Sequence, residues 1–147
     1  MKVSELMTKN PACATPDMEL NKVAKIMAKE NIGSVPVVEN KDSKKVIGMV
    51  TDRDIATRAV AQDKNPLQMT AREVMSKPVF TVNQDDDVRE VAKLMQERMV
   101  RRVPVVDQNG MVCGMVAQAD IALNTGDKTT ADVVQKISQP TGKQASR

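Results

Sequence analysis

The chain has 147 residues, of which 41% are hydrophobic and 28% charged, which fits one ordinary domain or two very small units that share a core. It contains no histidine, which excludes histidine-based metal centres and catalytic triads, and two cysteines far apart in sequence make a poor zinc site. The net charge of +3 is mild and Phe80 is the only aromatic residue, so the composition does not favour nucleic-acid binding.

The sequence shows no apolar run long enough to span a membrane, and its first residues lack the apolar block of a signal peptide. We therefore expect a cytoplasmic protein with no membrane partner. In that compartment Cys13 and Cys113 would stay reduced.

The first half of the chain predicts a short extended segment at Ala12-Cys13-Ala14 and then a helix. Thr15-Pro16-Asp17 is expected to open this helix, because threonine caps helices and proline suits the first helical position. Two strands are expected at residues 35–38 and 46–50, joined by a polar turn at 39–45, and a second helix is expected to start near Asp52. The first helix is expected to bury one apolar stripe with the i, i+3, i+4, i+7 spacing, which comprises Leu20, Val23, Ala24 and Met27.

The second half repeats this pattern, which marks the chain as a tandem repeat. Met7-Thr8-Lys9 returns as Met75-Ser76-Lys77, and Val35-Pro36-Val37-Val38 returns as Val103-Pro104-Val105-Val106. The expected elements are an extended segment at 79–82, a helix, strands at 103–106 and 111–116 with a turn at 107–110, and a second helix. The acidic run Asp85-Asp86-Asp87 suits the start of the first of these helices. Its apolar stripe comprises Val88, Val91, Ala92 and Met95.

The order β-α-β-β-α therefore occurs twice, which predicts a mixed α/β (α+β) fold. We expect repeat 1 at residues 1–62, a polar linker at 63–70 and repeat 2 at 71–124. Residues 125–147 are expected to form a short amphipathic helix and a flexible tail.

One motif of the repeat carries candidate chemistry. Gly48-Met49-Val50-Thr51-Asp52-Arg53-Asp54 returns as Gly114-Met115-Val116-Ala117-Gln118-Ala119-Asp120. In each copy an aspartate stands where a buried strand passes into a helix. A carboxylate at this point accepts hydrogen bonds from a diol such as ribose, and it can equally serve as an ordinary helix cap.

These repeated motifs resemble the cystathionine-β-synthase (CBS) domain, and two of them in tandem resemble a Bateman module. The resemblance covers nearly the whole chain. Within that family the chain is similar to small stand-alone bacterial CBS-pair proteins. It implies two repeats related by a pseudo-two-fold axis, with their β-sheets packed together and helices outside. It also implies clefts between the repeats that bind adenosine-containing ligands such as AMP, ADP, ATP, NAD or S-adenosylmethionine.

Carried over residue by residue, the resemblance implies ribose contacts for Asp54 and Asp120. It places Arg53 and the pair Arg101-Arg102 near phosphates, although Ala117 and Ala119 depart from the pattern of the first copy. The residues implied for the first cleft are Met49, Thr51, Arg53, Asp54, Val79, Phe80 and Thr81. Those implied for the second are Ala12, Cys13, Ala14, Arg101, Arg102, Met115 and Asp120.

The sequence thus predicts a non-catalytic regulatory module that binds an adenine nucleotide and requires no cofactor or metal. No paired base and nucleophile and no glycine-rich phosphate loop is present, so we expect no catalytic residues and no enzyme activity. The alternative is a ligand-free scaffold whose repeats only dimerise and present a surface to a protein partner. We also expect a homodimer, because the apolar helix faces of so small a chain need cover.

Overall fold

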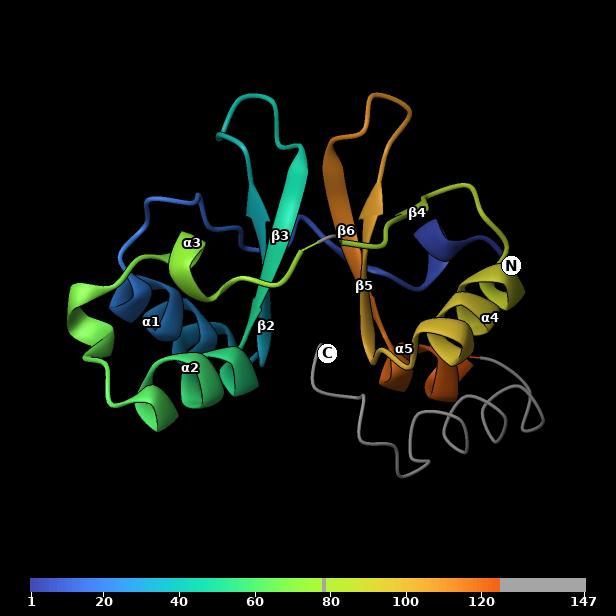
Figure 1. Ribbon diagram of the computed structural model, residues 1–147. Helices are drawn as coiled ribbons and strands as arrows, with labels where there is room; N and C mark the ends of the chain where they lie inside the picture. The colour runs from blue at the N-terminus through green and yellow to red at the C-terminus, as the bar shows by residue number, and fades with distance from the viewer. Residues whose placement is uncertain (78, 125–147) are drawn as a thin grey trace. The chain divides into compact units, whose positions relative to one another are not determined.

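The computed structural model describes residues 1–77 and 79–124 and confirms a mixed α/β fold (Figure 1). The chain divides into two compact units. The continuous unit is Pro11–Val79, and the discontinuous unit joins Met1–Asn10 to Phe80–Arg147. The helix and tail predicted for residues 125–147 lie outside the described residues.

The continuous unit is built on an antiparallel hairpin of β2 (Ser34–Val38) and β3 (Val46–Thr51), with Val35 opposite Val50. Helices α1 (Leu20–Glu30) and α2 (Asp52–Arg58) lie beside this hairpin (Figure 1). The unit also contains α3 (Ala71–Val74) and the 3-10 helices η2 (Val60–Gln62) and η3 (Pro66–Gln68). The predicted extended segment before α1 is reduced to one parallel bridge between Ala14 and Val37.

The start predicted for the first helix is wrong by several residues. Helix α1 begins at Leu20, whereas Thr15 to Met18 form a turn in which the Met18 N–H donates to the Thr15 carbonyl at 3.0 Å. The first helical N–H, that of Leu20, donates to the Met69 carbonyl at 2.8 Å. A backbone group distant in sequence therefore satisfies one of the N–H groups that have no partner within the helix at its start.

The discontinuous unit contains a four-stranded sheet in the order β1-β6-β5-β4. Its strands are β1 (Thr8–Lys9), β4 (Val82–Asn83), β5 (Arg102–Val106) and β6 (Val112–Ala117). Its helices are η1 (Val3–Glu5), α4 (Val88–Arg98) and α5 (Gln118–Asn124). The predicted turn between β5 and β6 is confirmed, and Gly110 adopts a φ of 78° there, a conformation that glycine reaches without strain.

The acidic run predicted to begin a helix does so in the discontinuous unit. The Asp87 side chain caps α4 by accepting the Arg89 N–H at 2.8 Å. All four residues of the apolar stripe predicted for α4 are buried, including Ala92. In α1 the equivalent residue Ala24 is exposed, so its inclusion in the predicted stripe was wrong. The two helices also have different neighbours: α4 packs against α5, whereas α1 packs against η3 and β2.

The core of each unit is completed by a segment that belongs to the other sequence repeat. Val3 and Leu6 lie in the core of the discontinuous unit with the β-strands of repeat 2. Ala71 and Val74 lie in the core of the continuous unit with the strands of repeat 1. The compact units are thus not the sequence repeats, since the two repeats exchange their first segments.

Each exchanged segment lies directly against the central glycine of a β-strand. Thr8 pairs with Met115 next to Gly114, and Ser76 forms a bridge with Met49 next to Gly48. A Cβ atom placed on Gly48 would lie 2.7 Å from the Met75 sulfur. The absence of a side chain at Gly48 thus makes room for the Met75 side chain, which would have to shift if a larger residue stood there.

Candidate functional site

The aspartate of the first repeated motif lies in a reciprocal cap at the start of α2. Thr51 ends β3 and is the N-cap residue, and its hydroxyl oxygen accepts the Asp54 N–H at 3.0 Å. The Asp54 Oδ2 in turn accepts the Thr51 N–H at 2.9 Å. This is a capping box, and it fixes the orientation of the Asp54 carboxylate against the end of the strand.

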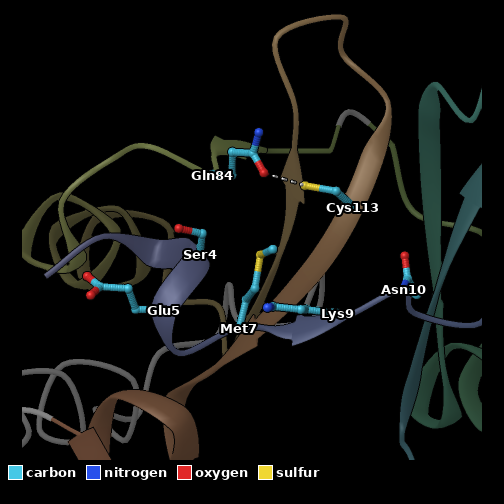
Figure 2. Close-up of a pocket in the computed structure, with 7 residues that line it drawn as sticks. All are labelled: Ser4, Glu5, Met7, Lys9, Asn10, Gln84 and Cys113. Atoms are coloured by element: carbon cyan, nitrogen blue, oxygen red, sulfur yellow. Dashed lines mark hydrogen bonds between the residues drawn. The ribbon is translucent and has the colours of Figure 1, made fainter.

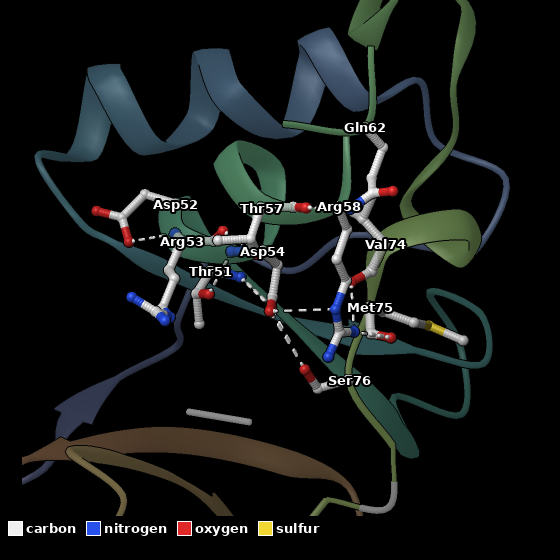
Figure 3. Close-up of polar contacts among 10 residues, drawn as sticks. All are labelled: Thr51, Asp52, Arg53, Asp54, Thr57, Arg58, Gln62, Val74, Met75 and Ser76. Carbon is white, nitrogen blue, oxygen red and sulfur yellow. Dashed lines mark hydrogen bonds and ion pairs between the residues drawn. The ribbon is translucent and has the colours of Figure 1, made fainter. Parts of the chain in front are cut away.

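Asp54 is also almost completely buried, with 1% of its surface exposed. Besides the capping bond, its carboxylate receives the Ser76 hydroxyl, whose Oγ lies 3.4 Å from Oδ1 and 3.5 Å from Oδ2. The Arg58 Nε lies 3.9 Å from Oδ1 (Figure 3). A buried carboxylate is costly unless it is paired and hydrogen-bonded, and these three groups provide that compensation.

Arg58 connects the aspartate to the exchanged segment. Its Nη1 donates to the carbonyl oxygens of Val74 at 3.0 Å and Met75 at 3.1 Å. The backbone of Ser76 is bonded to Met49 in both directions, at 2.8 and 3.2 Å. The segment that carries the Ser76 hydroxyl is thus held from two sides.

Ser76 and Arg58 were not among the residues predicted for the site. A signal for Arg58 was available, since Asp54 and Arg58 stand four residues apart and so face each other on a helix. The signal for Ser76 was weaker. It belongs to the repeated Met-(Thr/Ser)-Lys motif, but nothing in the sequence shows that this motif reaches the aspartate of the other repeat.

The other predicted residues of this motif are arranged around the same strand end. Met49 is half-buried in β3 opposite Pro36. Arg53 is exposed, and its side chain extends away from the Asp54 carboxylate (Figure 3). Its backbone N–H donates to the Asp52 carboxylate at 2.8 Å. The continuous unit therefore brings Met49, Thr51 and Asp54 together and leaves the Arg53 guanidinium in solvent.

The second aspartate has fewer partners. Asp120 is half-buried, and its Oδ2 accepts the Ala117 N–H at 2.7 Å. Alanine at 117 offers no hydroxyl to return a bond, so the capping box is one-sided. Asn124, at the position equivalent to Arg58, donates to the Asp120 backbone carbonyl at 2.7 Å and not to the carboxylate.

The remaining predicted residues of the first cleft divide between the two units. Val79 belongs to the continuous unit, whereas Phe80 and Thr81 belong to the discontinuous unit. The Phe80 ring is half-buried, and the Arg98 guanidinium lies 4.0 Å from its centroid in a cation–π contact. The structure therefore gives the surroundings of each of these residues only within the unit to which it belongs.

The predicted residues of the second cleft also come from both units. Ala14 is fully buried in the core of the continuous unit, next to Ala12 and Cys13 in the chain. Burial raises the pKa of the Cys13 thiol, and the charge of Lys44 partly opposes this shift, so the thiol is protonated at neutral pH. The discontinuous unit supplies Met115, Asp120 and the exposed pair Arg101 and Arg102.

A concavity of about 580 Å³ lies wholly within the discontinuous unit (Figure 2). The Cys113 thiol donates to the Gln84 Oε1 at 3.7 Å across its upper part. The pKa of Cys113 is raised by burial and by the nearby Asp107, which makes this thiol a poor nucleophile. The lining residues are Ser4, Glu5, Met7, Lys9, Asn10, Gln84 and Cys113, none of which was predicted as a site residue.

The comparisons with known proteins show the family. The model of the CBS domain matches residues 3–61 and 71–124. The protein YhcV of Bacillus subtilis, a CBS domain-containing protein, is 38% identical over 122 residues, which cover 83% of this chain and 84% of YhcV. Hypoxic response protein 1 of Mycobacterium tuberculosis is 30% identical over 92% of this chain and 93% of its own. The chain belongs to the CBS domain family and carries the domain twice.

The solved structures agree with this assignment. The CBS domain pair of protein MJ0100, in complex with 5'-methylthioadenosine and S-adenosyl-L-methionine, has a TM-score of 0.74 and 34% identity. It covers 84% of this chain, which in turn covers 94% of that pair. Hypoxic response protein 1, solved with two coordinated zinc ions, has a TM-score of 0.76 at 29% identity, over 86% of this chain and 100% of its own.

Some relatives are longer than this chain. An uncharacterized protein of Methanopyrus kandleri is 39% identical over 82% of this chain, which spans 61% of its length. A homoserine O-acetyltransferase of Methanococcus vannielii is matched over 24% of its length, at 34% identity over 81% of this chain. Within residues 1–77 and 79–124, no helix has the length and apolarity needed to cross a membrane.

Proposed function

We propose that this chain is a non-catalytic regulatory module that binds an adenosine-containing ligand through the Asp54 carboxylate. The observation that carries the proposal is a buried carboxylate whose orientation is fixed by the capping box with Thr51. A carboxylate accepts hydrogen bonds from the two vicinal hydroxyls of ribose, and such charge-assisted bonds are roughly twice as strong as neutral ones. The MJ0100 pair, which was solved with two adenosine-containing ligands, supports the same ligand class.

The neighbours of Asp54 suit the rest of such a ligand. Thr51 would contact ribose and base, and Arg53, whose guanidinium is free in solvent, would contact phosphate. Adenine would contact the apolar Met49. In the proposal Val79, Phe80 and Thr81 complete the base-binding groups.

A second, weaker site is proposed around Asp120. Its carboxylate has one backbone capping bond and is half-buried, so it is less firmly oriented than Asp54. Arg101 and Arg102 would supply phosphate contacts, with Met115 and the segment Ala12-Cys13-Ala14 at the base. We therefore expect the first site to dominate the binding of a free nucleotide.

Regulation follows from differential binding. A ligand shifts an equilibrium between two arrangements of the protein only by as much as its affinity for them differs. We propose that the functional form is a cytoplasmic homodimer and that the ligand biases this assembly or its contact with a protein target. Light scattering at micromolar concentration tests the dimer, and the mass of a single chain would contradict it.

Titration calorimetry tests the binding site. The ligands are AMP, ADP, ATP, NAD and S-adenosylmethionine, and the variants are Asp54→Asn, Asp54→Ala and Asp120→Ala. Asp54→Ala removes a charge-assisted contact, so affinity should fall at least tenfold, which corresponds to about 1.4 kcal/mol. Asp120→Ala should have a smaller effect, and Asp54→Asn, which keeps one acceptor, should lie between Asp54→Ala and the unchanged chain.

Asp52→Ala is the matched control, because Asp52 is an exposed carboxylate at the first position of the same helix. It should leave affinity unchanged. If none of the ligands binds the unchanged protein, the scaffold alternative is favoured. If ligands bind equally well to the Asp54 variants, this aspartate is a helix cap and not a ligand contact.

A further inference from the structure

The hydroxyl of Ser76 lies against the Asp54 carboxylate, the group proposed above to accept ligand hydroxyls. Its Oγ lies 3.4 Å from Oδ1 and 3.5 Å from Oδ2, so one hydroxyl faces both oxygens (Figure 3). Hydroxyl–carboxylate bonds are normally about 2.5–2.7 Å long. The contact is therefore longer and weaker than one that an incoming hydroxyl could make.

Ser76 reaches this position because its backbone is fixed. Its N–H donates to the Met49 carbonyl at 2.8 Å, and the Met49 N–H donates back at 3.2 Å. Arg58 holds the carbonyl oxygens of Val74 and Met75, which precede it. These bonds hold the Ser76 backbone in place, but its hydroxyl can move away from the carboxylate by rotation about the Cα–Cβ bond.

The other carboxylate oxygen contacts are of a different kind. The Thr51 N–H at 2.9 Å belongs to the helix cap and is required for the helix start. Arg58 lies 3.9 Å from Oδ1 and already donates to two carbonyl oxygens. Ser76 is therefore the partner that the carboxylate can exchange at the smallest cost.

The equivalent residue of the discontinuous unit does not repeat this contact. Thr8 corresponds to Ser76 in the repeat and pairs with Met115 as Ser76 does with Met49. Thr8 is exposed, however, and the described hydrogen bond to the Asp120 carboxylate comes from the Ala117 backbone. The serine contact is thus a property of the Asp54 site and not of the backbone fold that both units share.

We propose that Ser76 is a positioning residue that competes with ligand hydroxyls for Asp54 and thereby sets how strongly the site binds ribose. The proposal rests on the proposed function of Asp54. In this structure the Ser76 hydroxyl is one of the partners of the buried carboxylate. A ribose that binds must replace this bond, and the free energy of the lost bond is subtracted from its affinity.

The test uses Ser76→Ala in the full-length chain, with adenosine and 2',3'-dideoxyadenosine as probes in titration calorimetry. Ser76→Ala should raise the affinity for adenosine by about threefold to tenfold, since it removes a weak hydrogen bond to a charged acceptor. The affinity for dideoxyadenosine should not change, because that probe carries no hydroxyl at the competed position. Ser76→Thr keeps a hydroxyl and should bind adenosine as the unchanged chain does.

Thr8→Ala is the matched control and should leave both affinities unchanged. Thermal unfolding confirms that each variant is folded. If Ser76→Ala does not fold, Ser76→Cys replaces the hydroxyl with a weaker donor and should still raise adenosine affinity.

The proposal is overturned if Ser76→Ala weakens adenosine binding, leaves it unchanged, or strengthens both probes equally. It is also overturned if Thr8→Ala has the same effect. These results differ from a failure of the proposed function, in which the unchanged protein itself binds no adenosine and both proposals are lost together.

Discussion

In each of the two units a strand passes directly into a helix that carries an aspartate, and the two sites differ in what surrounds the carboxylate. In the continuous unit Asp54 is buried, capped reciprocally by Thr51 and contacted by Ser76 and Arg58. In the discontinuous unit Asp120 is half-buried and accepts one backbone N–H. The comparison teaches that the repeat conserves the position of the acidic group, while the exchanged segment and the last helical turn decide how firmly it is held.

The largest expected effect concerns the exchange of segments. A fragment of residues 11–79 contains the complete core of the continuous unit and should unfold cooperatively in urea, although at this size it should be marginally stable. A fragment of residues 1–62, the first sequence repeat, lacks Ala71, Val74 and Met75 and should show no cooperative transition. Circular dichroism across a urea titration measures both.

The control for this experiment is the other unit. Residues 80–147 lack Val3 and Leu6 and should gain a cooperative transition only when residues 1–10 are fused to them. Equal cooperativity of fragments 1–62 and 11–79 would show that the exchanged segments contribute little to either core.

A smaller effect separates the two aspartates in the absence of ligand. Asp54→Ala removes the side-chain half of the capping box, the ion pair with Arg58 and the acceptor of the Ser76 hydroxyl, so it should lower the free energy of unfolding by about 2–3 kcal/mol. Asp120→Ala removes one capping bond and should cost about 1 kcal/mol. Urea denaturation at pH 7 measures the difference, and equal losses would mean that Ser76 and Arg58 add nothing to the stability of the first turn.

The smallest expected effect is a pH-dependent change in stability from the cap of α4, which the cap position of α1 should not show. The Arg89 backbone N–H, and then its side chain, lower the pKa of Asp87 below its ordinary value. The stabilisation by this carboxylate is therefore present above the unfolded-state pKa and is lost as the pH falls through the lower folded-state value. At pH 7 the free energy of unfolding of Asp87→Ala should be lower than that of the unchanged chain. This difference, the stability gap, should close as the pH falls below about 4.

Glu19 is the matched control for Asp87, because it is the N-cap of α1 and its side chain makes no capping bond. Glu19→Ala should show no pH-dependent gap of this kind. A gap for Asp87→Ala that stays constant down to pH 2 would show that the carboxylate charge is not its source.

Much of the fold could be predicted because local patterns determine it. The alternation of strands, polar turns and amphipathic helices placed β2, β3, β5 and β6 correctly, and the repeated glycine-to-aspartate motif located both strand-to-helix turns. The errors arose where a distant segment overrides local preference. Thr15 and Pro16 are good helix openers, yet α1 begins later. The Met69 carbonyl accepts the Leu20 N–H at the start of α1, and the Ala71 N–H donates to the Met18 carbonyl just before it.

The candidate site shows the same limit. Asp54 and Thr51 were accessible from the sequence because their cap is local. Ser76 was not, because it reaches the carboxylate from the segment that opens the second repeat. Ala24 is exposed although its periodicity matches that of Ala92, since periodicity identifies a helix face but not the neighbour that covers it.

The exchange of first segments has a consequence for the order in which the chain folds as it is synthesised. Val3 and Leu6 leave the ribosome well before their core partners Val82, Val103 and Ile121, which are among the last described residues to emerge. All residues of the other core become available in between. Domains generally fold as they emerge, and contacts across long chain separations form slowly. The continuous unit is thus expected to fold before the discontinuous one. Until the strands of repeat 2 have been synthesised, the apolar side chains of Val3 and Leu6 are expected to stay exposed.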